Sequence, residues 1–225
     1  MIISEKESKL LIDSRHGKRV IEDMKKIEEI ASFTLGRNIS NDLHDAYFDS
    51  QQYDLARKYS YFRIRGRRDG HFITVRNKTS RVGDDIIIDE VTSPLDDKGV
   101  RIALSSLADN ITLGGPPQMT LPHFTEIFNS IGLEEVLRVR IERVEREIFM
   151  EDIKIGKMKA DVFQYIAPQT FGPFFEIEVD SYKQALYKSA KEFFSELSTK
   201  FGTVAEVSGT SKYVRGINIA YGLTF

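Results

Sequence analysis

The sequence predicts an α+β fold with a mainly antiparallel sheet, and three kinds of observation support this prediction. Charged and apolar residues alternate in several stretches, which is the pattern of strands with one charged and one apolar face. The dipeptide Asp69-Gly70 separates two such stretches and is typical of a tight hairpin turn. Helical stretches interrupt the strands in the order strand, helix, strands, helix, strands, helix, which favours the α+β class over alternating βαβ units.

The first half of the chain is expected to be strand-rich. Its first helix, from Gly17 to about Ile30, has Val20, Met24, Ile27 and Ile30 on one stripe. The other elements expected here are strands at 2–13, 42–49, 59–68, 72–78 and 86–92 and a helix at 98–108.

The second half repeats the arrangement after a loop that contains Gly114-Gly115-Pro116-Pro117. This loop is either a lid or a simple connector. The elements expected beyond it are helices at 123–131 and 182–200 and strands at 135–149, 153–163 and 174–180, with a turn at Glu151-Asp152 joining the first two of these strands. Because no segment has the composition of a linker, the sequence predicts a single domain over residues 1–225.

The composition excludes several classes of function. The net charge is −2, with 32 Lys and Arg against 34 Asp and Glu, so a general nucleic-acid coat protein is not expected. With no cysteine and four scattered histidines, a metal would be held by carboxylates, which favours Mg²⁺, Mn²⁺ or Ca²⁺. We find no apolar run of about 18 residues and no signal-peptide pattern, so we expect a cytoplasmic protein without a membrane partner.

Acidic side chains share a face on two of the expected strands. Glu5 and Glu7 lie two residues apart on one strand, and Glu176 and Glu178 on another, while Asp161 and Glu90 are further candidates. Crowded carboxylates repel one another unless cations lie between them. Two interpretations follow: ordinary solvated strand faces, or an oxygen cage for one or two Mg²⁺ or Mn²⁺ ions.

Basic side chains are distributed over several strands in the same alternating way. They can form a solvated sheet edge, or they can hold a chain of phosphates through the forked guanidinium groups of Arg and the point charge of Lys. Arg67 and Arg68 are interpreted as solvated residues at the hairpin end. The basic candidates for substrate binding are Lys9, Arg63, Arg65, Arg76, Lys78, Arg138, Arg140 and Lys212.

The ordered series of these segments resembles the CYTH superfamily, also called triphosphate tunnel metalloenzymes. Its N-terminal Glu-x-Glu-x-Lys hallmark stands here as Glu5 to Lys9. The other matching segments are Tyr47-Phe48-Asp49, Phe62-Arg63-Ile64-Arg65, Ile73-Thr74-Val75-Arg76, Arg138-Val139-Arg140, Asp161, Phe175-Glu176-Ile177-Glu178 and Ser211-Lys212-Tyr213. The resemblance covers almost the whole chain.

The resemblance implies an antiparallel eight-stranded β-barrel tunnel with a charged lumen and flanking helices. It implies that the metal ligands are Glu5, Glu7, Asp161, Glu176 and Glu178. It also implies that Lys9, Arg63, Arg65, Arg138, Arg140 and Lys212 hold the phosphates. One departure is that Arg76 replaces the usual Lys while Lys78 follows two residues later, so either side chain can be the one that reaches the phosphate.

The function implied is metal-dependent hydrolysis of a small-molecule triphosphate, with Mg²⁺ or Mn²⁺ as cofactor. Glu5, Glu7 and Lys9 are the catalytic candidates, and Glu5 or Glu7 would orient the attacking water. The alternatives are a class IV adenylyl cyclase, a thiamine triphosphatase and a non-catalytic polyphosphate-binding module. Neither nucleic acid nor a membrane is an expected partner, and the oligomeric state stays open, with a homodimer as one option.

Overall fold

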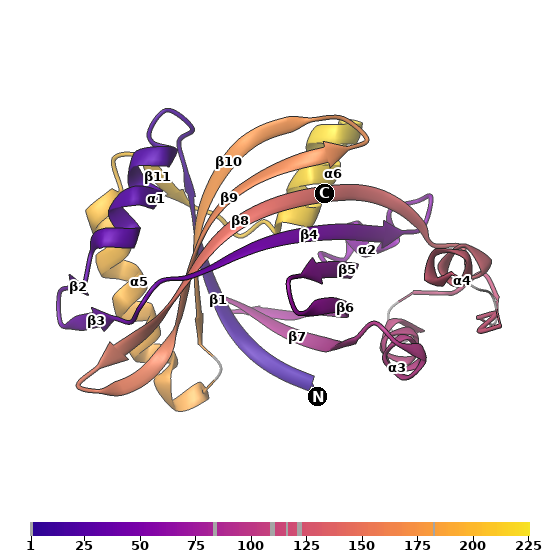
Figure 1. Cartoon of the computed structure of the whole chain (residues 1–225), viewed down its shortest axis with the longest axis horizontal. Helices are drawn as coiled ribbons and strands as arrows, with labels where there is room; N and C mark the ends of the chain where they lie inside the picture. Colours follow the sequence, from indigo (N-terminus) through magenta and orange to yellow (C-terminus); the bar gives the residue numbers. More distant parts are fainter. Residues whose placement is uncertain (1, 83–84, 109–110, 116, 121–122, 182) are drawn as a thin grey trace.

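A computed structural model describes the backbone of the chain apart from residues 1, 83–84, 109–110, 116, 121–122 and 182. Within the strands it leaves the side chains of residues 2–6 and 78–88 undescribed. The structure consists of one large antiparallel sheet with helices on its flanks (Figure 1).

Eight long strands make a ring of antiparallel pairings in the described backbone. The order of pairing is β8-β4-β5-β6-β7-β1-β10-β9, and β9 pairs in turn with β8. This ring confirms the predicted fold class and the predicted tunnel. The strands are β1 (Ile2–Ile12), β4 (Ile39–Asp49), β5 (Tyr61–Arg67), β6 (Gly70–Val82), β7 (Asp85–Pro94), β8 (Glu134–Met150), β9 (Ile153–Ala167) and β10 (Phe171–Ser181).

Shorter elements surround the ring. Strands β2 (Glu29–Ile30) and β3 (Phe33–Leu35) extend the sheet beyond β8, and β11 (Ala205–Val207) pairs with β1. Figure 1 shows α1 and α5 packed on one flank and α3 and α4 on the opposite flank. The helices are α1 (Gly17–Lys26), α2 (Asp54–Arg57), α3 (Asp97–Ala108), α4 (Phe124–Ser130), α5 (Tyr187–Phe201), which follows a 3₁₀ turn at Gln184–Leu186, and α6 (Lys212–Tyr221).

Among the described residues, none of these helices combines the length and the apolarity that crossing a bilayer requires.

The strands alternate between an apolar outer face and a polar inner face. On β10, Phe175, Ile177 and Val179 belong to the apolar cluster beneath α1 and α5. Each such buried side chain contributes about 1.5–3 kcal/mol through removal from water. A shift of one residue in register would turn all of them inward, so the helices fix which residues face the lumen.

Two hairpins set the register of their strands. β5 and β6 meet through the pair Arg67 and Gly70, and Gly70 adopts a φ of 140° that suits glycine. β8 and β9 are joined by Glu151 and Asp152, whose φ values of 48° and 66° are those of a type I′ turn. Both hairpins were predicted from the sequence, and both are confirmed.

The Gly114–Pro117 loop is a connector in its described part. The backbone N–H of Gly114 donates to the carbonyl oxygen of Ile131 at 2.8 Å, and Gln118 N–H donates to Ser130 Oγ at 3.3 Å. These contacts place the loop against the end of α4. Its described residues do not line the cavity inside the ring.

Helix α6 fills one end of the ring. Tyr213 stacks on Tyr47 with ring centroids 5.0 Å apart, and Ile217 is fully buried. A Cβ atom at Gly216 would lie 2.5 Å from both Leu137 and Tyr165, so only glycine allows this close approach. The sequence analysis predicted no helix here. A glycine in the middle of a short helix lowers its propensity by about 1 kcal/mol, so packing rather than local preference forms α6.

Candidate functional site

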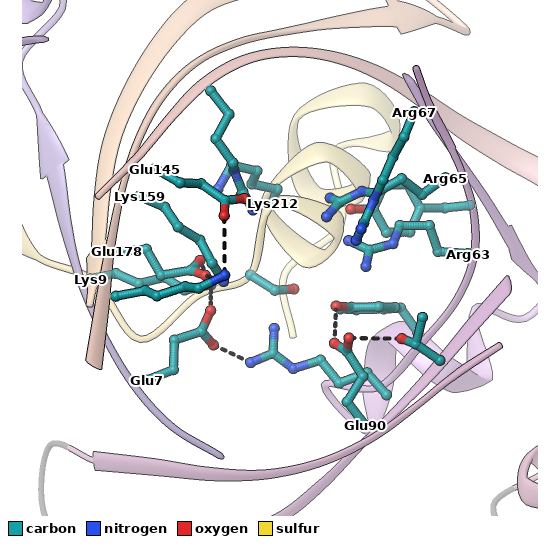
Figure 2. A pocket seen from close by; sticks show the side chains of 17 residues that line it. Glu7, Lys9, Arg63, Arg65, Arg67, Glu90, Glu145, Lys159, Glu178 and Lys212 are labelled. Atoms are coloured by element: carbon teal, nitrogen blue, oxygen red, sulfur yellow. Dashed lines mark hydrogen bonds and ion pairs between the residues drawn. The ribbon is translucent and has the colours of Figure 1, made fainter. Parts of the chain in front are cut away.

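A cavity of about 290 Å³ lies inside the ring of strands. Charged side chains dominate its lining, and they come from seven of the eight strands and from the start of α6. Figure 2 shows Arg63, Arg65 and Arg67 side by side on one wall, and Lys9 and Glu178 on the wall opposite. The cavity therefore has a basic wall and a wall of mixed charge.

The basic wall comes mainly from β5, where alternate residues face inward. Arg63 and Arg65 are each 6% exposed, and Arg76 of the neighbouring β6 is 8% exposed. Arg67 lines the cavity at its rim with its side chain over the Phe72 ring, 4.9 Å from the centroid. Arg67 is exposed at the hairpin end, as expected from the sequence, and its position on the inner face also makes it a rim residue of the cavity.

The opposite wall contains alternating carboxylates and lysines from β1, β9 and β10. The Nζ atom of Lys9 lies 2.9 Å from Glu7 Oε1 and 3.3 Å from Glu178 Oε2. Lys159 Nζ lies 2.7 Å from Glu178 Oε1 and also pairs with Asp180. Glu7 forms a further ion pair with Arg76. These contacts keep buried charges of both signs compensated.

Three of these carboxylates are close enough together to hold a metal ion. Glu7, Glu178 and Asp180 each offer an oxygen, and these oxygens lie within 4.8 Å of one another. Burial alone would raise the pKa of Glu178, but Lys159 and Lys9 outweigh burial and hold that pKa well below its usual range. Carboxylate oxygen ligands of this kind suit Mg²⁺ or Mn²⁺. Asp180 is not among the metal ligands expected from the sequence, although it shares a face with Glu176 and Glu178.

Two carboxylates expected to bind metal lie in a buried layer and do not line the cavity. Asp161 accepts two hydrogen bonds from Arg143, at 2.8 and 2.7 Å, and lies 2.8 Å from Lys212 Nζ. Glu176 pairs with Lys212 and with Arg215, the latter at 3.1 Å. Burial would raise the pKa of Asp161, but the cations of Arg143 and Lys212 lower it instead. In this structure both carboxylates are therefore paired with basic side chains.

Arg138 and Arg140 do not lie in the lumen, contrary to expectation. Their side chains are 56% and 50% exposed on the outer face of β8. Arg138 pairs with Glu135, and Arg140 Nε lies 3.5 Å from Asp42 Oδ1. Both arginines face away from the cavity.

The reason is that the inner face of β8 is apolar at its beginning. Leu137, Val139 and Ile141 point inward and pack in the cluster that includes α6. Charged residues reach the inner face only further along, at Arg143 and Glu145, where the strand borders the cavity. The sequence signal for Arg143 is its shared parity with Leu137 and Val139, which an assignment based on charge alone overlooks.

The side chains of Glu5 and Lys78 lie outside the described residues. The backbone pairs Glu5 with Ile88 of β7 and places it two residues before Glu7 on β1. Of the pair Arg76 and Lys78, Arg76 is the residue with a described side chain in the cavity.

Further polar residues reach the cavity without having been assigned to the site from sequence. Glu90, which the sequence left uncertain, accepts a hydrogen bond from Tyr61 Oη at 3.1 Å and another from Thr92 Oγ1 at 3.0 Å. Ser211 caps α6 by accepting from Val214 N–H at 3.2 Å, so the start of this helix borders the cavity beside Lys212. The partial positive charge of a helix N-terminus favours an anion there.

The comparisons with known proteins agree with this architecture. The family model of the CYTH domain matches residues 5–213. Among curated protein sequences the chain finds no match.

Three solved structures share the fold at low sequence identity. HpAC1 from Hippeastrum, described as an adenylyl cyclase candidate with a dominant triphosphatase activity, is 16% identical and has a TM-score of 0.59, with 98% of this chain and 97% of that chain covered. An adenylate cyclase candidate from Bacillus halodurans is 18% identical, with a TM-score of 0.56 and coverage of 95% and 97%. A conserved hypothetical protein from Pyrococcus furiosus is 13% identical, with a TM-score of 0.51 and coverage of 95% and 99%. With a family model that matches nearly its whole length, the chain belongs to the CYTH domain family.

Proposed function

We propose that this protein is a metal-dependent triphosphatase that cleaves a phosphoanhydride bond of a small-molecule triphosphate in the cavity. The observation that carries the proposal is that an arginine wall faces a wall with a cluster of carboxylates across one cavity. The first suits the oxygens of a phosphate chain, and the second suits a divalent cation. Membership of the CYTH family supports the same assignment.

The phosphate chain would lie between the two walls. Arg63, Arg65 and Arg76 would bind its oxygens from one side, and Lys9 and Lys212 from the other. Their cations would neutralise the charge that develops on the phosphoryl oxygens during transfer. Phosphoryl transfer depends mainly on such positioning and charge compensation.

The carboxylates would serve the metal and the water. Glu7, Glu178 and Asp180 are the proposed metal ligands, with Glu5 as a further candidate from its place on β1. When bound, a divalent cation would neutralise phosphate charge and make a bound water more acidic. Glu7 or Glu5 would orient the attacking water, and Lys9 would hold Glu7 in place through the pair at 2.9 Å.

Asp161 and Glu176 have a different proposed role. Both carboxylates lie behind the cavity wall, and they pair with Arg143 and Lys212, which line it. We therefore propose that Asp161 and Glu176 hold these two basic side chains in position. Arg138 and Arg140 have no part in the proposed site, since both face outward.

The test is incubation of pure protein with tripolyphosphate, ATP or thiamine triphosphate in Mg²⁺ or Mn²⁺, followed by assays for phosphate and cyclic AMP. We expect inorganic phosphate to be released by attack of water on a terminal phosphorus, with the corresponding diphosphate as the second product. Cyclic AMP from ATP would instead identify a cyclase. Tight binding without turnover would identify a polyphosphate-binding module.

A further inference from the structure

We infer that Asp45, a carboxylate behind the basic wall, is a positioning residue that aligns Arg63 and Arg65 as a two-guanidinium clamp for neighbouring phosphate oxygens. This inference rests on the proposed function and names a residue that the family resemblance does not include. Asp45 itself does not line the cavity, whereas both arginines do. It can therefore act on a ligand only through them.

The geometry fixes Arg65 most firmly. Asp45 lies directly opposite Arg65 in the pairing of β4 with β5. Arg65 Nε donates to Asp45 Oδ1 at 2.7 Å, and Arg65 Nη2 donates to Oδ2 at 2.6 Å. This two-point contact holds the guanidinium plane and leaves the Nη1 group of Arg65 outside it.

Arg63 is held by the same carboxylate but less completely. Its Nη1 group donates to Asp45 Oδ2 at 3.3 Å, and its guanidinium carbon lies 4.9 Å from the centroid of the Tyr61 ring. The Nε atom of Arg63 is buried and has no hydrogen-bond partner among the described residues. Because this atom is shielded from the cavity, it is not itself a ligand contact; it shows that Asp45 fixes Arg63 less completely than Arg65.

The charges support the same interpretation. One buried carboxylate faces two buried guanidinium groups, which leaves the clamp with a surplus positive charge. Without Asp45 the two arginines would repel each other, and their planes would no longer be fixed. Asp45 is 2% exposed, and the two arginines lower the pKa of its carboxyl group, which keeps it ionised. A phosphate chain would supply the remaining negative charge.

A purely structural ion pair between β4 and β5 is the competing explanation, and Asp45→Asn separates the two. The variant keeps the shape of the side chain but removes its charge. If Asp45 positions the clamp, the net charge of the clamp rises while its alignment is lost. We expect tripolyphosphate to bind about 3–10-fold more tightly in EDTA, measured by calorimetry, because the added charge attracts the anion. We expect kcat with Mg²⁺ to fall about 10–100-fold, because misplacement of catalytic groups has effects of that order.

A structural role would not produce this opposite movement of affinity and turnover. It would instead lower the fraction of protein that binds, together with kcat. Unchanged kcat, or weaker binding of tripolyphosphate, in folded Asp45→Asn would overturn the inference. Asp42→Asn is the matched control. Asp42 lies on the outer face of β4, the strand of Asp45, and its exposed carboxylate pairs with Arg140, so its replacement should change neither the affinity for tripolyphosphate nor kcat.

Two further variants make the test decisive. In an Arg65→Lys background, Asp45→Asn should lower kcat by a clearly smaller factor than in the wild type, because a lysine has no planar fork to align and only Arg63 still depends on Asp45. An equal loss in both backgrounds would show that Asp45 does not act through Arg65. If Asp45→Asn does not fold, Asp45→Glu takes its place: it keeps the charge and moves the carboxylate by one methylene, so kcat should fall with affinity retained, and unchanged kcat would refute the inference.

Failure of the proposed function would look different. If the wild-type protein binds tripolyphosphate but never cleaves it, the triphosphatase assignment is wrong. The affinity measurements in EDTA still test the clamp in that case, because they do not require turnover.

Discussion

The two faces of strand β8 carry the same residue type in opposite environments. Arg140 is half exposed on the outer face and lies 3.5 Å from Asp42. Arg143, three positions further along, is buried on the inner face and makes a two-point contact with Asp161. Both arginines are ion-paired across to a neighbouring strand. An ion pair by itself therefore does not show which arginine contributes to stability. Burial does, and so does a second basic partner on the same carboxylate, as Lys212 is for Asp161.

The largest difference between the faces is expected in stability. Arg143→Ala should lower the free energy of unfolding by about 3 kcal/mol, because it leaves Asp161 buried with fewer partners. Arg140→Ala should change it by less than about 0.5 kcal/mol, since exposed ion pairs contribute little. Urea denaturation of the two variants beside the wild type measures both values. Equal losses would remove the distinction between the faces.

The next largest difference is expected in activity. Arg65→Ala should lower the rate of tripolyphosphate hydrolysis about 100–1000-fold, which is the usual effect of removing a group that stabilises developing charge. Arg138→Ala, on the outer face, should stay within about 2-fold of the wild type. Circular dichroism and thermal unfolding establish that both variants are folded. A strong loss of activity in Arg138→Ala would show that Arg138 does contribute to the site.

Metal binding provides a third comparison between the faces. Mn²⁺ or Mg²⁺ at about 100 times its Kd should stabilise the metal-free protein by about 2.7 kcal/mol, and chelation should reverse the effect. Glu178→Gln should remove most of this stabilisation, because it takes one ligand from the Glu7, Glu178 and Asp180 cluster. Glu142→Gln on the outer face is the control. Stabilisation that survives Glu178→Gln would place the metal elsewhere.

The smallest effect is expected in the acid range. Burial would raise the pKa of Asp45, but Arg65 and Arg63 lower it to about 2. Since the unfolded chain has a pKa near 3.9, the Asp45 contribution of about 2 kcal/mol is complete above about pH 4 and is lost as the pH falls through about 2. The stability difference between the wild type and Asp45→Asn should therefore shrink from pH 5 to pH 2. A difference that stays constant over this range would contradict the lowered pKa.

Much of the architecture was predictable from the sequence because strand periodicity is local. Alternating residues such as Glu7 and Lys9, or Arg63 and Arg65, identified inner faces without any knowledge of the partner strands. The Glu151-Asp152 turn was likewise predictable, since two long strands flank it. These signals lie within a few residues of one another.

What the sequence could not reveal depends on contacts between distant segments. Arg138 and Arg140 were assigned to the lumen because the segment Arg138-Val139-Arg140 resembles a phosphate-binding segment of the family, which implied that this charged face points inward. At the start of β8 the reverse holds, because α6 makes that end of the ring apolar. Asp45 was missed for a related reason: nothing in its own strand shows that Arg63 and Arg65 of β5 close around it.

Helix α6 also determines how a ligand can travel. Since Tyr213 and Ile217 are packed into one end of the ring, that end is a blind end, and a phosphate chain cannot thread past it. Under the proposed function, substrate and products would both pass the rim near Arg67. A channel closed at one end in this way would suit one short phosphate chain at a time and would not slide along a long polymer.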